Sequence, residues 1–108
     1  MNLNEYTKGW IVGDFSPAIL KSKDIEVGIK KYVAGDKEPK HVHKFVDEYT
    51  IVISGKIKMN DVEYSNNDIV LIEKTNYNTF ECLEDATLVI LKTPSIPTDK
   101  YLSINDGE

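Results

Sequence analysis

Two histidines stand one residue apart near the middle of the chain, and a glutamate follows at short range. His41 and His43 flank Val42, and Glu48 comes five positions after the second histidine. Side chains two residues apart on a β-strand share a face, so the two imidazoles would point together and Val42 away. Two neutral imidazoles and a carboxylate form a facial triad, which binds a divalent metal and leaves positions open for water or substrate. The spacing therefore predicts a metal site, with a metal-free polar cluster as the alternative.

The elements that must position these residues are predicted to be short β-strands separated by turn residues. Strands are expected over 25–35, 48–54, 69–72, 78–83 and 87–93, and a hairpin that turns at Asn60-Asp61 over 56–64. Glu84-Asp85 is expected to separate the last two strands, and 17–23 to form one short turn or helix. A tight return over 44–47 would bring Glu48 beside the imidazoles. Strands that recur about every ten residues favour a sandwich or a small closed barrel.

The stretch from Gly35 to Gly55 resembles the first motif of the cupin superfamily, G-x5-H-x-H-x(3,4)-E-x6-G, and every fixed position matches. The resemblance covers roughly residues 25–93. It implies an all-β, single-domain cupin, which is a jelly-roll-type antiparallel β-barrel. The expected divisions are an N-terminal arm or strand with a possible short helix over 1–24, the barrel core over 25–93 and a C-terminal tail over 94–108. The resemblance also implies that His41, His43 and Glu48 hold a divalent transition metal, namely Fe, Mn, Ni or Zn.

The second cupin motif, G-x5-P-x-G-x2-H-x3-N, is degenerate in this chain. Aligned with it, Asn67 takes the place of the first glycine, Glu73 that of the proline and Thr75 that of the second glycine. Asn78 falls on the histidine that normally supplies a fourth ligand, and Cys82 falls on the final asparagine. The resemblance thus implies that Asn78 is a weak fourth ligand or contacts a water on the metal. The alternative is an ordinary polar residue at the barrel mouth.

Strand parity predicts which other side chains share the interior with the metal site. Thr50 and Val52 have the parity of Glu48, and Phe80 and Cys82 have that of Asn78. The predicted pocket is mostly apolar around a small polar centre, and a filled core is the alternative. Its expected lining residues are Thr50, Val52, Ile57, Met59, Phe80 and Cys82. Lys30, Lys31 and Tyr32 precede the motif. One of the three could reach the pocket, and surface exposure is the default expectation for both lysines.

Composition limits the partners of the protein. A net charge of −5 without a block of basic residues argues against nucleic acid, because phosphate binding needs a basic face. The apolar runs are too short to cross a membrane, and the lone Cys82 suits a reducing compartment. A soluble, cytoplasmic protein is therefore expected. Cupins commonly dimerise, and the segment around Trp10 is apolar, so a homodimer is expected. Trp10 is expected to anchor the N-terminal strand or to form part of the dimer contact. The tail is expected to pack lightly through Ile96, Tyr101 and Leu102.

Three functions are compatible with these residues. The first is a metal-dependent enzyme that acts on a small oxygen-bearing metabolite, as a dioxygenase, isomerase or lyase. The second is a non-catalytic barrel that binds or senses a small molecule such as a sugar derivative, which the missing second-motif histidine favours. The third is an accessory dimer with a vestigial site. The sequence assigns no general acid or base beyond Glu48, which the metal itself would engage.

Overall fold

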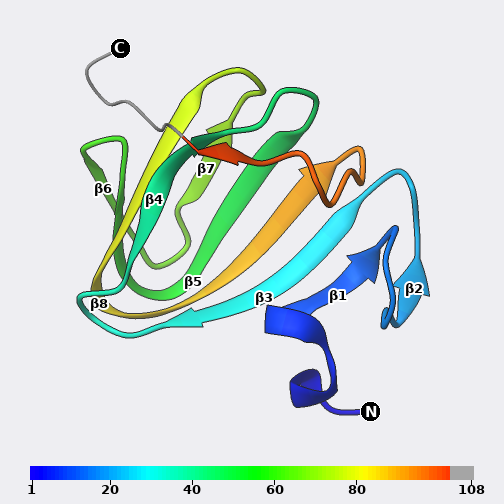
Figure 1. Cartoon of the computed structure of the whole chain (residues 1–108). Helices are drawn as coiled ribbons and strands as arrows, with labels where there is room; N and C mark the ends of the chain where they lie inside the picture. Colours follow the sequence, from blue (N-terminus) through cyan, green and yellow to red (C-terminus); the bar gives the residue numbers. More distant parts are fainter. Residues whose placement is uncertain (103–108) are drawn as a thin grey trace.

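Two long antiparallel strands, β5 and β8, run through the whole molecule and connect its two halves (Figure 1). The computed structural model describes residues 1–102, which are mostly strand. Its elements are η1 (Leu3–Glu5), η2 (Thr7–Gly9), β1 (Trp10–Gly13), β2 (Leu20–Lys21), β3 (Glu26–Tyr32), β4 (Lys37–Val42), β5 (Asp47–Met59), β6 (Val62–Ser65), β7 (Ile69–Ile72), β8 (Tyr77–Thr93) and β9 (Tyr101–Leu102). No helix within residues 1–102 has the length and apolar character needed to span a bilayer.

Each half of β5 and β8 belongs to a different layer. The first half of β5 and the second half of β8 pair with β7 and β3 respectively, and β1 extends this layer beyond β3. The second half of β5 and the first half of β8 pair with β6 and β4, and β9 joins β4. The apolar core lies between the layers and contains Val52, Ile57, Met59, Val70, Ile72, Phe80, Cys82, Ala86, Leu88 and Ile90.

The strand breaks expected at Gly55 and at Glu84-Asp85 are wrong, because both strands continue through these points. The β5–β8 register shifts on either side of Gly55, so the strands bend there rather than end. Gly55 has a φ of +95°, and a Cβ at this position would collide with the carbonyl oxygen of Asp85. Only glycine fits so close an approach with that backbone conformation. The predicted hairpin is confirmed, since Asn60 and Asp61 both have positive φ values, 49° and 65°, as a type I′ turn requires.

The sequence predicted one short turn or helix over 17–23, and no helix forms there. The short helical turns lie earlier in the chain, at η1 and η2, and 20–21 instead forms β2 parallel to β1. The backbone N–H groups of Ile19 and Ser22 donate to the carbonyl oxygens of Ile11 and Gly13 at 2.8 and 3.1 Å. The carbonyl oxygens at the edge of β1 therefore accept from backbone N–H groups of 19–22, which a helix would have paired within itself.

The tail is held mainly by buried polar groups; of the apolar residues expected to pack it, only Ile96 is half-buried. Ser95 and Asp99 are buried, whereas Tyr101 and Leu102 are exposed although they form β9 beside β4. The Ser95 hydroxyl donates to the buried Glu26 carboxylate at 2.9 Å and accepts from the backbone N–H of Asp14 at 2.8 Å. The rest of the predicted tail, 103–108, lies outside the described residues.

Candidate metal centre

Three buried side chains converge where β4 ends and β5 begins. His41 belongs to β4, His43 follows it directly, and Glu48 is the second residue of β5. The potential ligand atoms of the three residues all lie within 4.8 Å of one another. Their exposed fractions are only 4%, 2% and 5%. The structure therefore brings together the predicted ligand set, and the tight return over 44–46 places Glu48 as the spacing required.

Hydrogen bonds orient both imidazoles in the same way. The Nδ1 atom of His43 contacts the backbone carbonyl oxygen of Asp99, and that of His41 lies 3.0 Å from the carbonyl oxygen of Pro39. A carbonyl oxygen only accepts, so Nδ1 is the donor in both rings, and Nε2 is the ring nitrogen left for another ligand. Burial lowers the pKa of His41, and the charge of Lys100 lowers it further, which keeps this ring neutral. Partners of this kind fix the ring orientation of metal-binding histidines.

The Glu48 carboxylate faces His43 as an anion. Burial by itself would raise the pKa of Glu48, but the adjacent His43, the positive charge of Lys92 and the Thr50 hydroxyl hold it below its usual range. Thr50 donates to Oε2 of Glu48 at 3.1 Å, and Oε1 lies 3.4 Å from Nε2 of His43. The site therefore presents an ionised oxygen and two imidazole nitrogens at close range.

Two buried polar atoms at the site make no hydrogen bond within the described residues. They are Nε2 of His43 and Oδ1 of Asn78. Such orphaned atoms are rare in protein interiors because each forfeits its hydration without a replacement. A cation among them would satisfy the nitrogen, the amide oxygen and the Glu48 carboxylate together. The donor set thus fits a divalent transition metal.

Asn78 lies on β8 directly opposite His41, and its side chain is 3% exposed. It lines the same cavity as His41 and Glu48. Phe80 is also interior, as parity predicted, while Thr79 bonds to the Asn60 side chain on the outside. Asn78 and Phe80 therefore share the inner face of β8, which is the strand parity that the alignment of the degenerate second motif requires.

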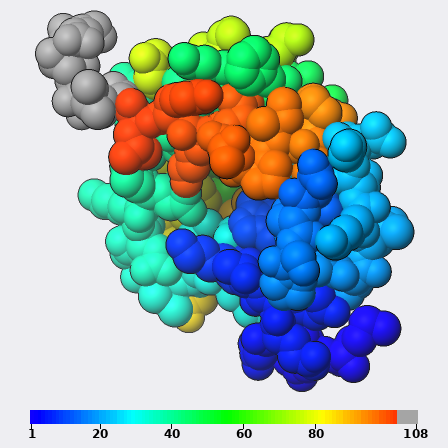
Figure 2. Space-filling model, turned by 45° about the vertical axis from the view of Figure 1, so that its right-hand side comes forward, coloured from blue at the N-terminus to red at the C-terminus, as the bar shows by residue number. Residues whose placement is uncertain are grey.

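The site opens into a cavity of about 550 Å³. Figure 2 shows a hollow in the surface, bounded by the N-terminal segment, by β4 and by the segment after β8. Of the predicted lining, Thr50, Met59 and Phe80 border the cavity. Val52, Ile57 and Cys82 do not; they are fully buried in the apolar core, where close packing of the two layers leaves no space beside them.

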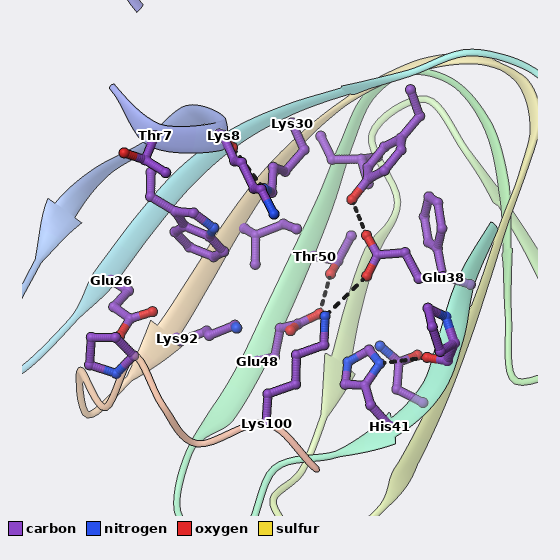
Figure 3. A pocket seen from close by; sticks show the side chains of 18 of the residues that line it. Thr7, Lys8, Glu26, Lys30, Glu38, His41, Glu48, Thr50, Lys92 and Lys100 are labelled. Atoms are coloured by element: carbon purple, nitrogen blue, oxygen red, sulfur yellow. Dashed lines mark hydrogen bonds and ion pairs between the residues drawn. The ribbon is translucent and has the colours of Figure 1, made fainter. Parts of the chain in front are cut away.

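Several cavity residues were missed from the sequence, as the close view in Figure 3 illustrates. Trp10 lines the cavity, although it was expected to lie outside the site, and it also packs against the core. Lys30 also lines it instead of lying on the surface, because the inner face of β3 carries Glu26, Gly28, Lys30 and Tyr32. The alternation of this strand could have identified Lys30 as an inward-facing residue. For Trp10, the neighbouring sequence does not indicate that its segment forms a strand beside β3.

A second polar group lies in the same cavity. The Tyr32 hydroxyl donates to Oε2 of Glu38, and Lys100 Nζ lies 3.5 Å from Oε1 of Glu38. Burial would raise the pKa of Glu38, yet Tyr32 and Lys100 hold it below its usual range. Burial together with Glu38 raises the pKa of Tyr32. The cavity therefore contains an ionised carboxylate that lies outside the His41, His43 and Glu48 cluster.

Comparison with known proteins assigns the fold. No protein-family model matches the chain, and no curated protein matches it by sequence. Among solved structures, the chain is 18% identical to KdgF from Halomonas sp., with a TM-score of 0.64 over 70% of this chain and 74% of KdgF. It is 17% identical to an uncharacterised double-stranded β-helix protein from Klebsiella pneumoniae, with a TM-score of 0.71 over 97% of this chain and 91% of that one. It is 15% identical to the DMSP lyase DddQ from Ruegeria pomeroyi, with a TM-score of 0.74 over 92% of this chain.

These likenesses define a double-stranded β-helix protein, and other neighbours are described as RmlC-like cupins. The chain has the cupin fold, which confirms the all-β, jelly-roll-type architecture that the first motif implies. The chain spans 52% of the length of DddQ. At these identities the likeness concerns the fold alone, and chemistry depends on the site.

Proposed function

We propose that the protein is a metal-dependent cupin enzyme acting on a small oxygen-bearing metabolite. His41, His43 and Glu48 would hold a divalent transition metal, which is Fe, Mn, Ni or Zn. The observation that carries this proposal is the buried, unpartnered Nε2 of His43 facing the ionised Glu48 at 3.4 Å. When bound, the metal supplies Lewis-acid or redox chemistry toward an oxygen of the substrate.

Residues around the ligand cluster and in the cavity have distinct roles in this proposal. Asp99 and Thr50 orient His43 and Glu48 through the contacts already described. The Glu38 carboxylate is ionised and lies beyond the ligand cluster, so it can accept a proton from a substrate while Tyr32 and Lys100 hold it in place. Met59, Phe80 and Leu88 provide the apolar wall that excludes water.

The structural neighbours give this proposal limited support. DddQ is named as a DMSP lyase, so one protein with this fold carries out a lyase reaction. A non-catalytic barrel that binds or senses a small molecule such as a sugar derivative is the second candidate. It is favoured by Asn78, because an amide oxygen is a weaker ligand for these metals than the imidazole that the second cupin motif supplies.

A turnover screen tests the proposal against this alternative. Metal-free protein is loaded separately with Fe²⁺, Mn²⁺, Ni²⁺ or Zn²⁺ and incubated with a panel of small hydroxy acids, keto acids and sugar acids. Product that requires one metal supports the enzyme. Saturable binding without product supports the binding barrel, and metal-free protein is the control for both. If no metal produces turnover or binding, both proposals fail.

The Asn78→His variant should bind metal more tightly than the wild type. It replaces an amide oxygen, opposite His41 in the ladder, with an imidazole nitrogen. We expect an increase in affinity of about tenfold or more, measured by competition with a chelator at fixed pH. Thr79→His, on the other face of β8, is the matched control and should leave the affinity unchanged. Equal affinities for wild type and Asn78→His, with both folded, would show that position 78 does not face the metal.

We also propose that the protein is a homodimer formed through the outer face of the first layer. Two ladder rows place eight apolar residues side by side across β3, β8, β5 and β7. They are Val27, Leu91, Tyr49 and Leu71 in one row and Ile29, Val89, Ile51 and Ile69 in the other. A continuous apolar face is typical of a surface that pairs with a second copy.

Sedimentation measurements test the dimer. Leu71 is 47% exposed, so Leu71→Lys should leave the fold intact but place a charge at the interface. We expect this variant to be monomeric at concentrations where the wild type is a dimer. Val33→Lys changes a residue that is 59% exposed outside the face and should remain dimeric. A dimeric Leu71→Lys variant would rule out this face.

A further inference from the structure

Four lysines gather at the cavity although the chain as a whole is acidic, with a net charge of −5. They are Lys8, Lys30, Lys92 and Lys100. Of these four lysines, Lys100 alone has a carboxylate oxygen of the described residues within ion-pair distance, that of Glu38 at 3.5 Å. The other three ammonium groups are uncompensated by direct pairing, which is unusual for a cavity wall.

Trp10 brings two of these lysines together. The Nζ atoms of Lys30 and Lys92 lie 5.0 and 4.9 Å from the centroids of its ring system. Gly28 makes this possible, because a Cβ at that position would press against the indole. Lys30 also donates to the carbonyl oxygen of Lys8 at 2.7 Å. Two cations are thus fixed at one aromatic wall, with N–H groups still available to a ligand.

The ammonium groups of Lys30 and Lys92 repel each other in this position. Burial lowers the pKa of Lys30, and the charges of Lys92 and Lys8 lower it further, while Glu38 acts in the opposite direction. The carboxylates of the cavity are occupied elsewhere: Glu26 accepts from Ser95, Glu38 from Tyr32 and Glu48 from Thr50. A bound anion would relieve the repulsion between the lysines.

The lysine pair adjoins the metal centre. In the ladders of β8, Lys92 is the cross-strand neighbour of Glu48 on one side and of Glu26 on the other. Figure 3 shows the Lys92 side chain directed toward Glu48. A small molecule that contacts Lys92 and Lys30 therefore also lies beside the ligand cluster.

We propose that the cavity takes an anionic metabolite, whose carboxylate or phosphate group binds between Lys30 and Lys92 against Trp10. The anion site itself needs no metal. The further statement that another oxygen of the same molecule faces the metal rests on the function proposed above. Charge-assisted hydrogen bonds from two ammonium groups supply the affinity for the anionic end.

Calorimetric titration of metal-free protein with inorganic phosphate and with malonate, at constant ionic strength in chloride, tests the anion site. We expect saturable binding of at least one probe, and the tighter one identifies the anionic group. The double variant K30Q/K92Q should weaken this binding about tenfold or more. K30R/K92R retains both charges and should retain binding, which separates loss of charge from loss of fold.

Lys31→Gln is the matched control, because Lys31 lies next to Lys30 on β3 but is exposed. It removes one positive charge from the other face and should change probe binding by less than about twofold. An equal loss in Lys31→Gln, or no saturable binding of either probe to the wild type, would overturn the anion site.

Chelator competition on the same proteins keeps this proposal distinct from the metal-dependent function. The single variant K30Q, added to these proteins, leaves Lys92 in place beside Glu48, so it should bind metal with an affinity close to that of the wild type while weakening probe binding. A wild type that binds the probe but no metal would refute the proposed function and leave the anion site standing. A wild type that binds metal but neither probe would refute the anion site and leave the proposed function standing.

Discussion

The His43→Ala variant is expected to lose metal binding, with an affinity at least about 100-fold below that of the wild type. The change removes Nε2 of His43, which is buried and makes no hydrogen bond to the described residues, and it leaves His41 and Glu48 as the main ligands. Two protein ligands rarely retain a labile divalent metal. Chelator competition at fixed pH measures the loss, because protons compete with the metal for imidazole.

Val42→Ala is the matched control for this experiment. Val42 lies between the two histidines, and alternation turns its side chain away from theirs. Its substitution should leave the affinity within about twofold of the wild type, even if stability falls. Metal binding by folded His43→Ala at wild-type affinity would mean that the metal is held elsewhere.

The Asp99→Ala variant is expected to weaken both the fold and the metal site. The Asp99 carboxylate is buried and accepts the backbone N–H groups of Lys44, Phe45 and Val46 at 3.0, 2.8 and 3.0 Å. Its backbone carbonyl also accepts from Nδ1 of His43. Without the carboxylate, three buried or partly buried donors lose their partner, which should lower the free energy of unfolding by about 3 kcal/mol. Metal affinity should fall about 10- to 100-fold, as for other residues that orient a ligand.

Urea denaturation of metal-free protein and chelator competition measure the two effects separately. Asp99→Asn retains one acceptor oxygen, so it should fall between the wild type and Asp99→Ala in both measurements. Asp47→Ala is the control for loss of an aspartate carboxylate beside the loop. The Asp47 carboxylate is partly exposed and, among the described residues, accepts a hydrogen bond only from the backbone N–H of Lys74. A folded Asp99→Ala protein with wild-type stability and metal affinity would show that the loop holds its shape without this clamp.

The candidate metal centre was predictable from the sequence because its residues are close together in the chain. A two-residue spacing on one strand and a short return were enough to place His41, His43 and Glu48 together. What holds the return in shape was not predictable. Asp99 lies more than 50 residues beyond the loop that it caps, and no periodicity connects a Pro-rich tail to that loop.

The interior was predictable only where strand parity decides it. Parity placed Thr50, Asn78 and Phe80 inside, and the structure places them there. The same reasoning could not show that β5 and β8 continue through Gly55 and Glu84-Asp85, because acidic and glycine residues are typical of turns. The close contact between Gly55 and the backbone of Asp85 keeps the two strands paired, so the chain bends at these positions instead of turning.

The lysines of the cavity show a different limit. Lysine is mostly exposed in proteins, so residue type alone argued against placing Lys30 and Lys92 inside, although strand alternation points to it. Both are on the inner face because their strands alternate, and both are retained there beside Trp10. Such exceptions to burial preference are expected at functional sites rather than in an ordinary core.

Anomalous X-ray scattering at the absorption edge of the bound metal tests the central claim most directly. Untagged protein is loaded with Fe²⁺, Mn²⁺, Ni²⁺ or Zn²⁺ and crystallised without a chelator. The account predicts one strong peak bounded by the Nε2 atoms of His41 and His43 and an oxygen of Glu48. A folded, metal-loaded crystal with no peak among these three residues would contradict it.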